Sequence, residues 1–249
     1  MRSEIKKQRE MNYNDYEMDV ALRERELEAS AALPALMRKV YVWMTLALAI
    51  TGFTAYAVAT IPNLQQFVLF NSWVMWGLII AEFGLVMAIS WGINKLSLTT
   101  ATLLFVLYSV INGATLSLIF VAYSIGTIST VFFITAGTFA VMAFIGYVTK
   151  TDLTKLGKIL FMALIGLVIA TIVNIFVKSS GLDLILSYVG VLVFVGLTAY
   201  DTQKIKQMLW QAGNLSEGAQ KIALLGALSL YLDFINLFLY LLRIFGRRD

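Results

Sequence analysis

Three acidic residues lie within, or directly after, stretches that are otherwise almost entirely apolar. Glu82 is near the centre of one stretch, Asp233 is near the centre of another, and Asp201 immediately follows a third. Charged groups at the centre of a bilayer are costly, so they usually face a cavity and mark a path for ions or protons. The alternative is a protonated carboxyl that only links helices. No basic residue occurs between Lys39 and Lys95 that could neutralise Glu82, and this favours an ion path over a purely structural role.

Polar residues around Asp233 fall on one face of a helix, because steps of three and four residues separate them. They are Gly226, Ser229, Asp233, Asn236, Tyr240 and Arg243. Such a helix fits best in the middle of a bundle, with this polar seam turned to a cavity. The preceding apolar stretch offers a matching face through Ser187, Gly190, Thr198 and Asp201. We therefore predict a cation pathway formed by Glu82, Ser229 and Asn236 together with the aspartates.

The predicted chemistry of Asp201 and Asp233 is that of a carboxyl pair. Two carboxyls in a low dielectric cannot both ionise comfortably, so the pair tends to hold a proton. When both are deprotonated, a hard cation such as calcium relieves their repulsion, and acidification displaces it. The chain contains no histidine and no cysteine, which leaves carboxylates as the proton sensors and excludes zinc sites of the usual ligand types.

The elements that position these residues are predicted to be membrane helices. Hydrophobic residues make up 59% of the 249 residues and charged residues only 14%, far from the balance of a soluble domain. A helix needs about 20 apolar residues to span a bilayer. Seven stretches meet that length without alternating as barrel strands would: 40–60, 73–93, 101–123, 128–148, 159–177, 184–200 and 222–245. We predict an all-α polytopic membrane protein with the lipid bilayer as its surroundings.

The chain divides into a polar, mixed-charge N-terminal tail at residues 1–37 and a transmembrane domain at residues 38–249. Such a tail is typically solvated and partly helical or disordered, and partner binding is the alternative. Asn112 and Gly113 in the third span are interpreted as ordinary helix-packing residues. The net charge of +4 is interpreted as membrane topology, so no nucleic-acid partner is expected.

A cytoplasmic N-terminus agrees with the positions of the lysines. It leaves only Lys178 outside and places the others in cytoplasmic loops: Lys95, Lys150, Lys155, Lys158, Lys204, Lys206 and Lys221. A seventh full crossing would break this pattern by placing Arg243, Arg247 and Arg248 outside. Either the last segment is an atypical central or re-entrant helix, or the early spans determine the orientation.

Two C-terminal motifs resemble the Bax inhibitor family, also called the transmembrane Bax inhibitor motif family. They are GLTAYDTQKIK at 196–206 and LSLYLDFINLFLYLLRIFG at 228–246. The stretch NGATLSLIF at 112–120 and the seven-segment layout fit the same family. The resemblance covers roughly residues 38–246. It implies a seven-helix bundle with six helices around a central seventh, and a pH-sensitive calcium leak with roles in calcium homeostasis and stress response.

The resemblance also assigns residues to that activity. The family's pH-sensing aspartate pair matches Asp201 and Asp233, which would also be the calcium ligands. Glu82 matches an acidic position of the second helix in bacterial members. Some bacterial members carry basic residues at the end of that helix, where this chain has Ile93 with Lys95 nearby. Either Lys95 snorkels back to form a latch, or the closed state rests on the carboxyl pair alone.

Other function classes fit the sequence less well. Intramembrane aspartyl proteases also use two carboxyls, but their second motif, GxGD, requires a glycine where Leu232 precedes Asp233. Their PAL triplet occurs here only at residues 34–36, before the first span. We therefore predict no enzyme activity and no cofactor, with calcium as the transported ion.

The remaining alternative is a membrane regulator that binds partners such as a membrane-anchored protease or the cell-death machinery, with the charged tail as a contact. The short loops favour a bacterial inner membrane over the endoplasmic reticulum.

Overall fold

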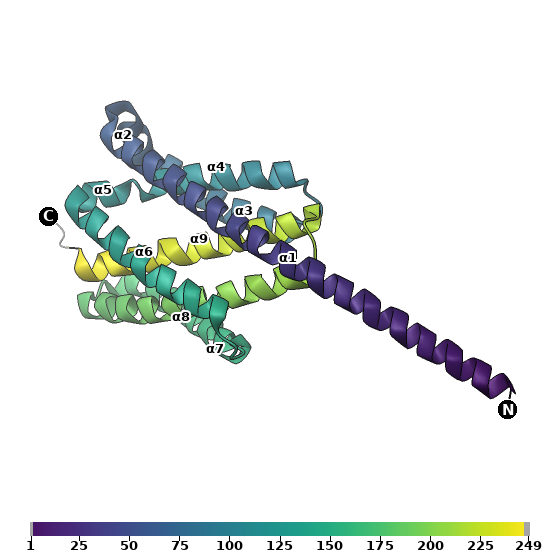
Figure 1. The fold of residues 1–249 in the computed structure, drawn as a ribbon. Helices are drawn as coiled ribbons and strands as arrows, with labels where there is room; N and C mark the ends of the chain where they lie inside the picture. Colours follow the sequence, from purple (N-terminus) through teal and green to yellow (C-terminus); the bar gives the residue numbers. More distant parts are fainter. Residues whose placement is uncertain (1, 247–249) are drawn as a thin grey trace.

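The computed structural model describes residues 2–246, with side chains described from residue 16 onward, and within that range the chain is helical with no strand (Figure 1). The helices are α1 (Arg2–Thr60), α2 (Pro62–Leu69), α3 (Ser72–Gly92), α4 (Leu98–Leu116), α5 (Leu118–Ala122), α6 (Ile125–Val148), α7 (Thr154–Val177), α8 (Ser180–Ala212) and α9 (Glu217–Phe245). Seven helical segments in this range are long and apolar enough to span a membrane, with α4 and α5 forming one segment. The predicted all-α polytopic class is confirmed. Arg247 and Arg248, which enter the topology question, lie outside the described residues.

Five of the spans, α3, α4, α6, α8 and α9, begin where a serine or asparagine caps the first turn, whereas α7 begins after Leu153 without a side-chain cap. The side chain of Asn71 accepts hydrogen bonds from the backbone amides of Trp73 and Val74 at the start of α3. Serine side chains accept equivalent bonds before α4, α6, α8 and α9. These caps satisfy amides that the helix itself leaves unpaired. These capping residues therefore place the starts of the helices close to the starts of the apolar stretches.

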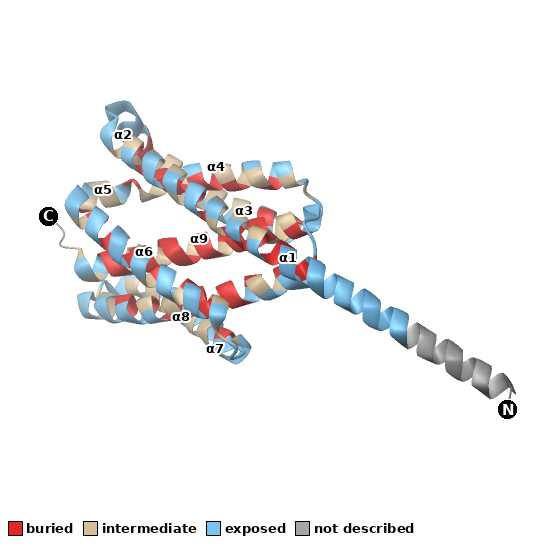
Figure 2. Ribbon diagram, viewed as in Figure 1, coloured by how far each residue is buried: buried red, intermediate tan, exposed pale blue. Residues whose placement is uncertain are grey.

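Helix α9 is the most deeply buried span (Figure 2). In its most apolar window 61% of the residues are buried, against 6% for α3 and for α7. It packs against α8, α1, α6 and α4, whereas α3 packs mainly on α4 and α7 mainly on α8. A ring of six helices around a central seventh is therefore not confirmed, although α9 lies in the interior.

Glycines bring α8 close to α6 and to α9. A Cβ on Gly146 of α6 would collide with the carbonyl oxygen of Ala199, and a Cβ on Gly226 of α9 would lie 2.9 Å from the Ile205 side chain. Such close approach between helices requires small residues. The α6–α8 contact lies two residues from Asp201, so this packing positions the carboxylate.

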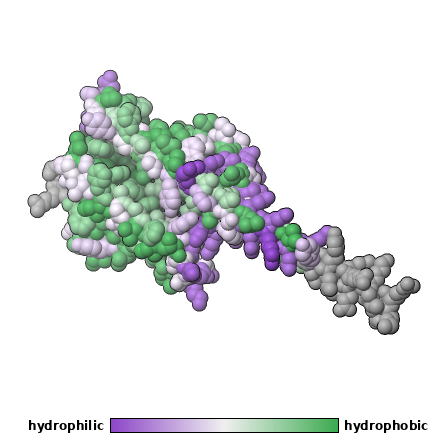
Figure 3. Space-filling view, in the orientation of Figure 1, coloured by the Kyte–Doolittle hydropathy of each residue, from purple (hydrophilic) through white to green (hydrophobic). Residues whose placement is uncertain are grey.

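Helix α1 runs without a break from the membrane region into an arm that projects from the bundle (Figure 1). Residues 16–28 of the arm are exposed, and burial begins at Ala29, inside the predicted tail. The boundary between residues 37 and 38 stays a prediction. Hydrophobic side chains cover most of the visible bundle surface, and hydrophilic ones gather where the arm joins it (Figure 3). That distribution fits a bundle surrounded by lipid.

Candidate functional site

The two predicted aspartates line one cavity, of about 940 Å³, between α7, α8 and α9. Asp201 comes from α8 and Asp233 from α9, and Ser229 and Asn236 of α9 line the same cavity. The structure thus brings together four of the predicted site residues. The opposite wall is supplied mainly by α7 and is largely apolar, with Phe161 as one of its members.

Asp233 is buried, with 5% of its surface exposed. Its Oδ2 atom has no hydrogen-bond partner among the residues that the structure describes. Buried polar atoms nearly always have a partner, because leaving one unpaired costs free energy. Asp201 is half-buried in the same cavity. Their placement suits the binding of a proton, a water molecule or a cation between the two carboxyls.

The oxygen atoms around the aspartates could serve a hard cation only weakly. Calcium takes six to eight oxygen ligands in proteins. Asn236 uses its Nδ2 to donate to the carbonyl of Leu232 at 2.8 Å, which leaves its Oδ1 as an acceptor. Together with the Ser229 hydroxyl, this gives two carboxylates and two neutral side-chain oxygens. No cluster of three or more acidic, histidine or cysteine side chains occurs in the described residues, so the set suits a passing ion better than a resident one.

Two lysines line the same cavity, Lys158 from α7 and Lys204 from α8. Lys204 lies one helical turn after Asp201, and its Nζ is 5.8 Å from the centre of the Tyr200 ring. Their charges oppose those of the aspartates. Cation binding near Asp201 is therefore weaker than it would be in a cavity whose only charged groups were acidic.

The polar seam of α9 faces α8 along its length. Gly226 lies against Ile205, the ring of Tyr240 stacks on Phe194 at 5.9 Å between centroids, and Arg243 lies 3.7 Å from Asp183. On the matching face of α8, Ser187 and Thr198 donate instead to carbonyls of their own helix. In that face, Asp201 is therefore the acidic group turned to the cavity.

Glu82 does not line this cavity. Its carboxylate accepts a hydrogen bond of 2.6 Å from the Thr115 hydroxyl, which links α3 to α4. The sequence placed Glu82 on the same cation path as Asp233, and the structure does not bring the two together in one cavity. Lys95 is exposed in the loop between α3 and α4.

A second polar cluster joins α1, α4 and α9. The Tyr231 hydroxyl donates to Asn112 Oδ1 at 2.8 Å and lies 2.7 Å from the Thr51 hydroxyl, which donates to the carbonyl of Ser109 at 2.9 Å. Tyr231 precedes Asp233 by two residues, so the two side chains leave α9 on opposite sides. Thr51 and Tyr231 were not found from the sequence, and Asn112 was interpreted as a packing residue. The sequence feature that could have revealed this cluster is that each of these residues carries a polar group inside an apolar span.

We predict that Tyr231→Phe destabilises the protein by about 1–2 kcal/mol, because the buried Thr51 and Asn112 lose a shared partner. The measurement is thermal or denaturant unfolding in detergent micelles. Tyr240→Phe is the matched control on the same helix, since Tyr240 is only half-buried and packs through its ring. Equal stabilities of the two variants would contradict a structural role for the Tyr231 hydroxyl.

Residues 33–249 match the protein family described as "Inhibitor of apoptosis-promoting Bax1". The chain belongs to the Bax inhibitor family. It is 48% identical to the inner membrane protein YbhL of Escherichia coli K12 over 223 residues, which are 89% of this chain and 95% of the relative. A Borreliella burgdorferi protein is 47% identical over 212 residues, covering 85% of this chain and 91% of the relative. The protein RP147 of Rickettsia prowazekii is 39% identical over 234 residues, covering 94% and 98%.

Membership confirms the family predicted from the two C-terminal motifs, and both motifs lie inside the matched residues. Together with the seven apolar segments, it identifies an integral membrane protein with transmembrane helices. The matches to these relatives cover 85% to 94% of the chain.

Proposed function

We propose that the protein is a pH-sensitive calcium or cation leak pathway, gated by Asp201 and Asp233 in the cavity between α7, α8 and α9. One observation carries the proposal: a buried carboxylate with an unpaired oxygen shares a cavity of about 940 Å³ with a second carboxylate. Buried ionisable groups of membrane spans commonly mark ion paths. We assign neither aspartate a catalytic role.

The proposed mechanism depends on the charge of the pair. With both carboxyls deprotonated, their repulsion is relieved by a cation held between them, assisted by the oxygens of Ser229 and Asn236. Acidification gives the pair a shared proton, which removes the charge that holds the cation. We therefore expect cation flux to fall as the pH falls. A role for Glu82 further along the path stays a prediction, because it lies outside this cavity.

We infer that the protein lies in a bacterial inner membrane with its N-terminus in the cytoplasm. The Escherichia coli relative is an inner membrane protein by name. Three hydrogen bonds hold the segments beside the lysine-rich loops together at one end of the bundle. Lys39 of α1 donates to Gln220 at the start of α9, and the Leu98 amide at the start of α4 donates to Glu217. Lys206 of α8 donates to the carbonyl of Tyr147 at the end of α6. Basic loops are typically cytoplasmic.

Helix α9 crosses from that basic end to the other. It begins beside the α3–α4 loop at Glu217, and near its end Arg243 pairs with Asp183 at the start of α8. Of the two explanations for the C-terminal arginines, this favours a full crossing whose orientation is set by the early spans.

The proposal is tested with the purified wild-type protein in liposomes that contain a calcium indicator. Influx is measured from about pH 5 to about pH 8, the range in which a coupled carboxyl pair can titrate. Sodium and protein-free liposomes serve as comparisons, and circular dichroism shows that the protein is folded. A calcium flux that decreases on acidification supports the proposal. Folded protein that moves no calcium at any pH would refute it.

One observation favours a second function, that of a membrane regulator that binds a protein partner. The exposed part of the α1 arm carries uncovered apolar side chains, including Tyr16, Met18, Leu22 and Leu27. Deleting residues 1–30 separates the two functions. If the variant loses its cellular effect but keeps calcium flux, the biological role belongs to partner binding. If it keeps both, the arm has no part in that role.

A further inference from the structure

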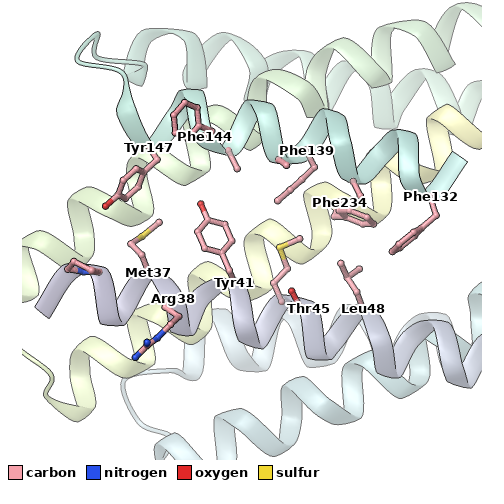
Figure 4. Close-up of a pocket in the computed structure, with 15 residues that line it drawn as sticks. Met37, Arg38, Tyr41, Thr45, Leu48, Phe132, Phe139, Phe144, Tyr147 and Phe234 are labelled. Atoms are coloured by element: carbon pink, nitrogen blue, oxygen red, sulfur yellow. The ribbon is translucent and has the colours of Figure 1, made fainter. Parts of the chain in front are cut away.

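A second large cavity is a groove of about 640 Å³ between α1 and α6 (Figure 4). Tyr41 and Leu48 project from α1, Phe139 and Tyr147 project from α6, and Phe234 of α9 closes the groove behind them. In the described range, α1 and α6 do not pack closely on each other, although each packs on α9. The groove therefore separates two neighbouring spans and has α9 as its floor.

The groove opens to the side, toward the hydrocarbon of the bilayer. Phe132, Ala140 and Phe144 line it and are exposed. It extends along α1 from Pro34 to Leu48, which is about 20 Å at a rise of about 1.5 Å per residue. Half of a bilayer's hydrocarbon core is about 15 Å thick. The groove is therefore long enough for one acyl chain of one leaflet, and its apolar lining suits such a chain.

The charges at one end of the groove are positive. Arg38 lines the groove and also lines an adjoining cavity of about 370 Å³, together with Lys39. In Figure 4 the guanidinium of Arg38 points away from the aromatic side chains, as a charged group that avoids hydrocarbon does. Within the described part of the chain, no acidic residue lines either cavity, and Arg38 has no carboxylate within ion-pair distance. A phosphate group would complement this end of the groove.

We propose that the groove between α1 and α6 binds an anionic phospholipid, with one acyl chain along the aromatic side chains and the phosphate at Arg38. The acyl chain packs on Phe234, the residue that follows Asp233 on α9, so the occupant contacts the helix that carries the central carboxylate. Neither the aspartates nor calcium are needed for this binding. It is therefore independent of the proposed leak activity.

The test uses the wild-type protein in phosphatidylcholine vesicles with a small amount of spin-labelled phosphatidylglycerol or spin-labelled phosphatidylcholine. The fraction of motionally restricted label measures the lipid held at the protein surface. Wild type is expected to favour phosphatidylglycerol, and Arg38→Gln to lose about five-fold of that preference, as one basic residue near an anionic lipid contributes. An unchanged preference in Arg38→Gln would overturn the headgroup assignment.

Ala140→Trp fills the groove from α6 and is expected to remove most of the preference for phosphatidylglycerol over phosphatidylcholine in the restricted component. Val141→Trp is the matched control, because Val141 is the next residue, is exposed, and does not line the groove. If Ala140→Trp keeps the wild-type preference for phosphatidylglycerol, the groove is not the lipid site. A second copy of the chain as occupant would appear as an Ala140→Cys cross-linked dimer, which is specific because the chain contains no cysteine, and that result would also overturn the proposal.

Discussion

Replacing Asp233 with asparagine is expected to remove the pH dependence of calcium flux. A single titrating group changes a rate by at most about ten-fold per pH unit, and we expect Asp233→Asn to vary by less than about two-fold from about pH 6 to about pH 8. The reason is that Asp233 is the fully buried member of the pair and has an oxygen without a partner. Asparagine keeps the shape of the side chain but cannot titrate or carry the charge that holds a cation.

The same substitution is not expected to unfold the protein. Burying an ionised carboxylate costs more than burying a neutral amide of the same size, so Asp233→Asn should be at least as stable as wild type. A loss of pH dependence in a folded variant then reports on the site. The measurement combines liposome flux across the pH series with unfolding in detergent.

Two further variants test whether the effect belongs to the pair. Asp201→Asn should shift and weaken the pH response without abolishing it, because Asp201 is only half-buried and has Lys204 beside it. Asp183→Asn is the control, since Asp183 pairs with Arg243 near the ends of α8 and α9, outside the cavity. A wild-type pH profile in Asp233→Asn, or an equal loss in Asp183→Asn, would contradict the gating pair.

The second large effect is expected at Gly146, where an added methyl group should separate α6 from α8. A Cβ there would collide with the Ala199 carbonyl oxygen and would lie 2.9 Å from the Ala199 Cα, and these are backbone atoms that cannot rotate away. Overpacking of this kind typically costs about 1–3 kcal/mol. We predict that Gly146→Ala lowers the free energy of unfolding by an amount in this range. The substitution should also disturb flux, because Asp201 lies two residues from the contact.

Gly137 provides a matched control on the same helix. Nothing lies within 4 Å of a Cβ added there, so Gly137→Ala should be neutral or stabilising by up to about 1 kcal/mol through helix propensity. Both variants are compared by denaturant unfolding in the same detergent. If Gly146→Ala is as stable as Gly137→Ala, the close approach of α6 and α8 is not a feature of the folded protein.

Much of the fold follows from the sequence, because the bilayer sets strict requirements. Seven apolar stretches of spanning length predict seven helices, and Asn71 or a serine caps the start of five of them. The three- and four-residue spacing around Asp233 correctly indicates that Ser229, Asp233 and Asn236 share a face of α9, since helical period alone decides this. The motifs around Asp201 and Asp233 were sufficient to identify the family.

Which faces meet was decided only by the tertiary structure. Lipid tails are as apolar as a protein core, so hydropathy does not distinguish a buried helix from a lipid-facing one. Helix α7 is more hydrophobic than α9, yet only 6% of the residues in its most apolar stretch are buried, against 61% in α9. For the same reason the sequence could not separate Glu82 from the aspartate cavity, or join Thr51, Asn112 and Tyr231 in one cluster. Helical spacing defines the direction of a side chain around its own helix, and only packing determines what that side chain meets.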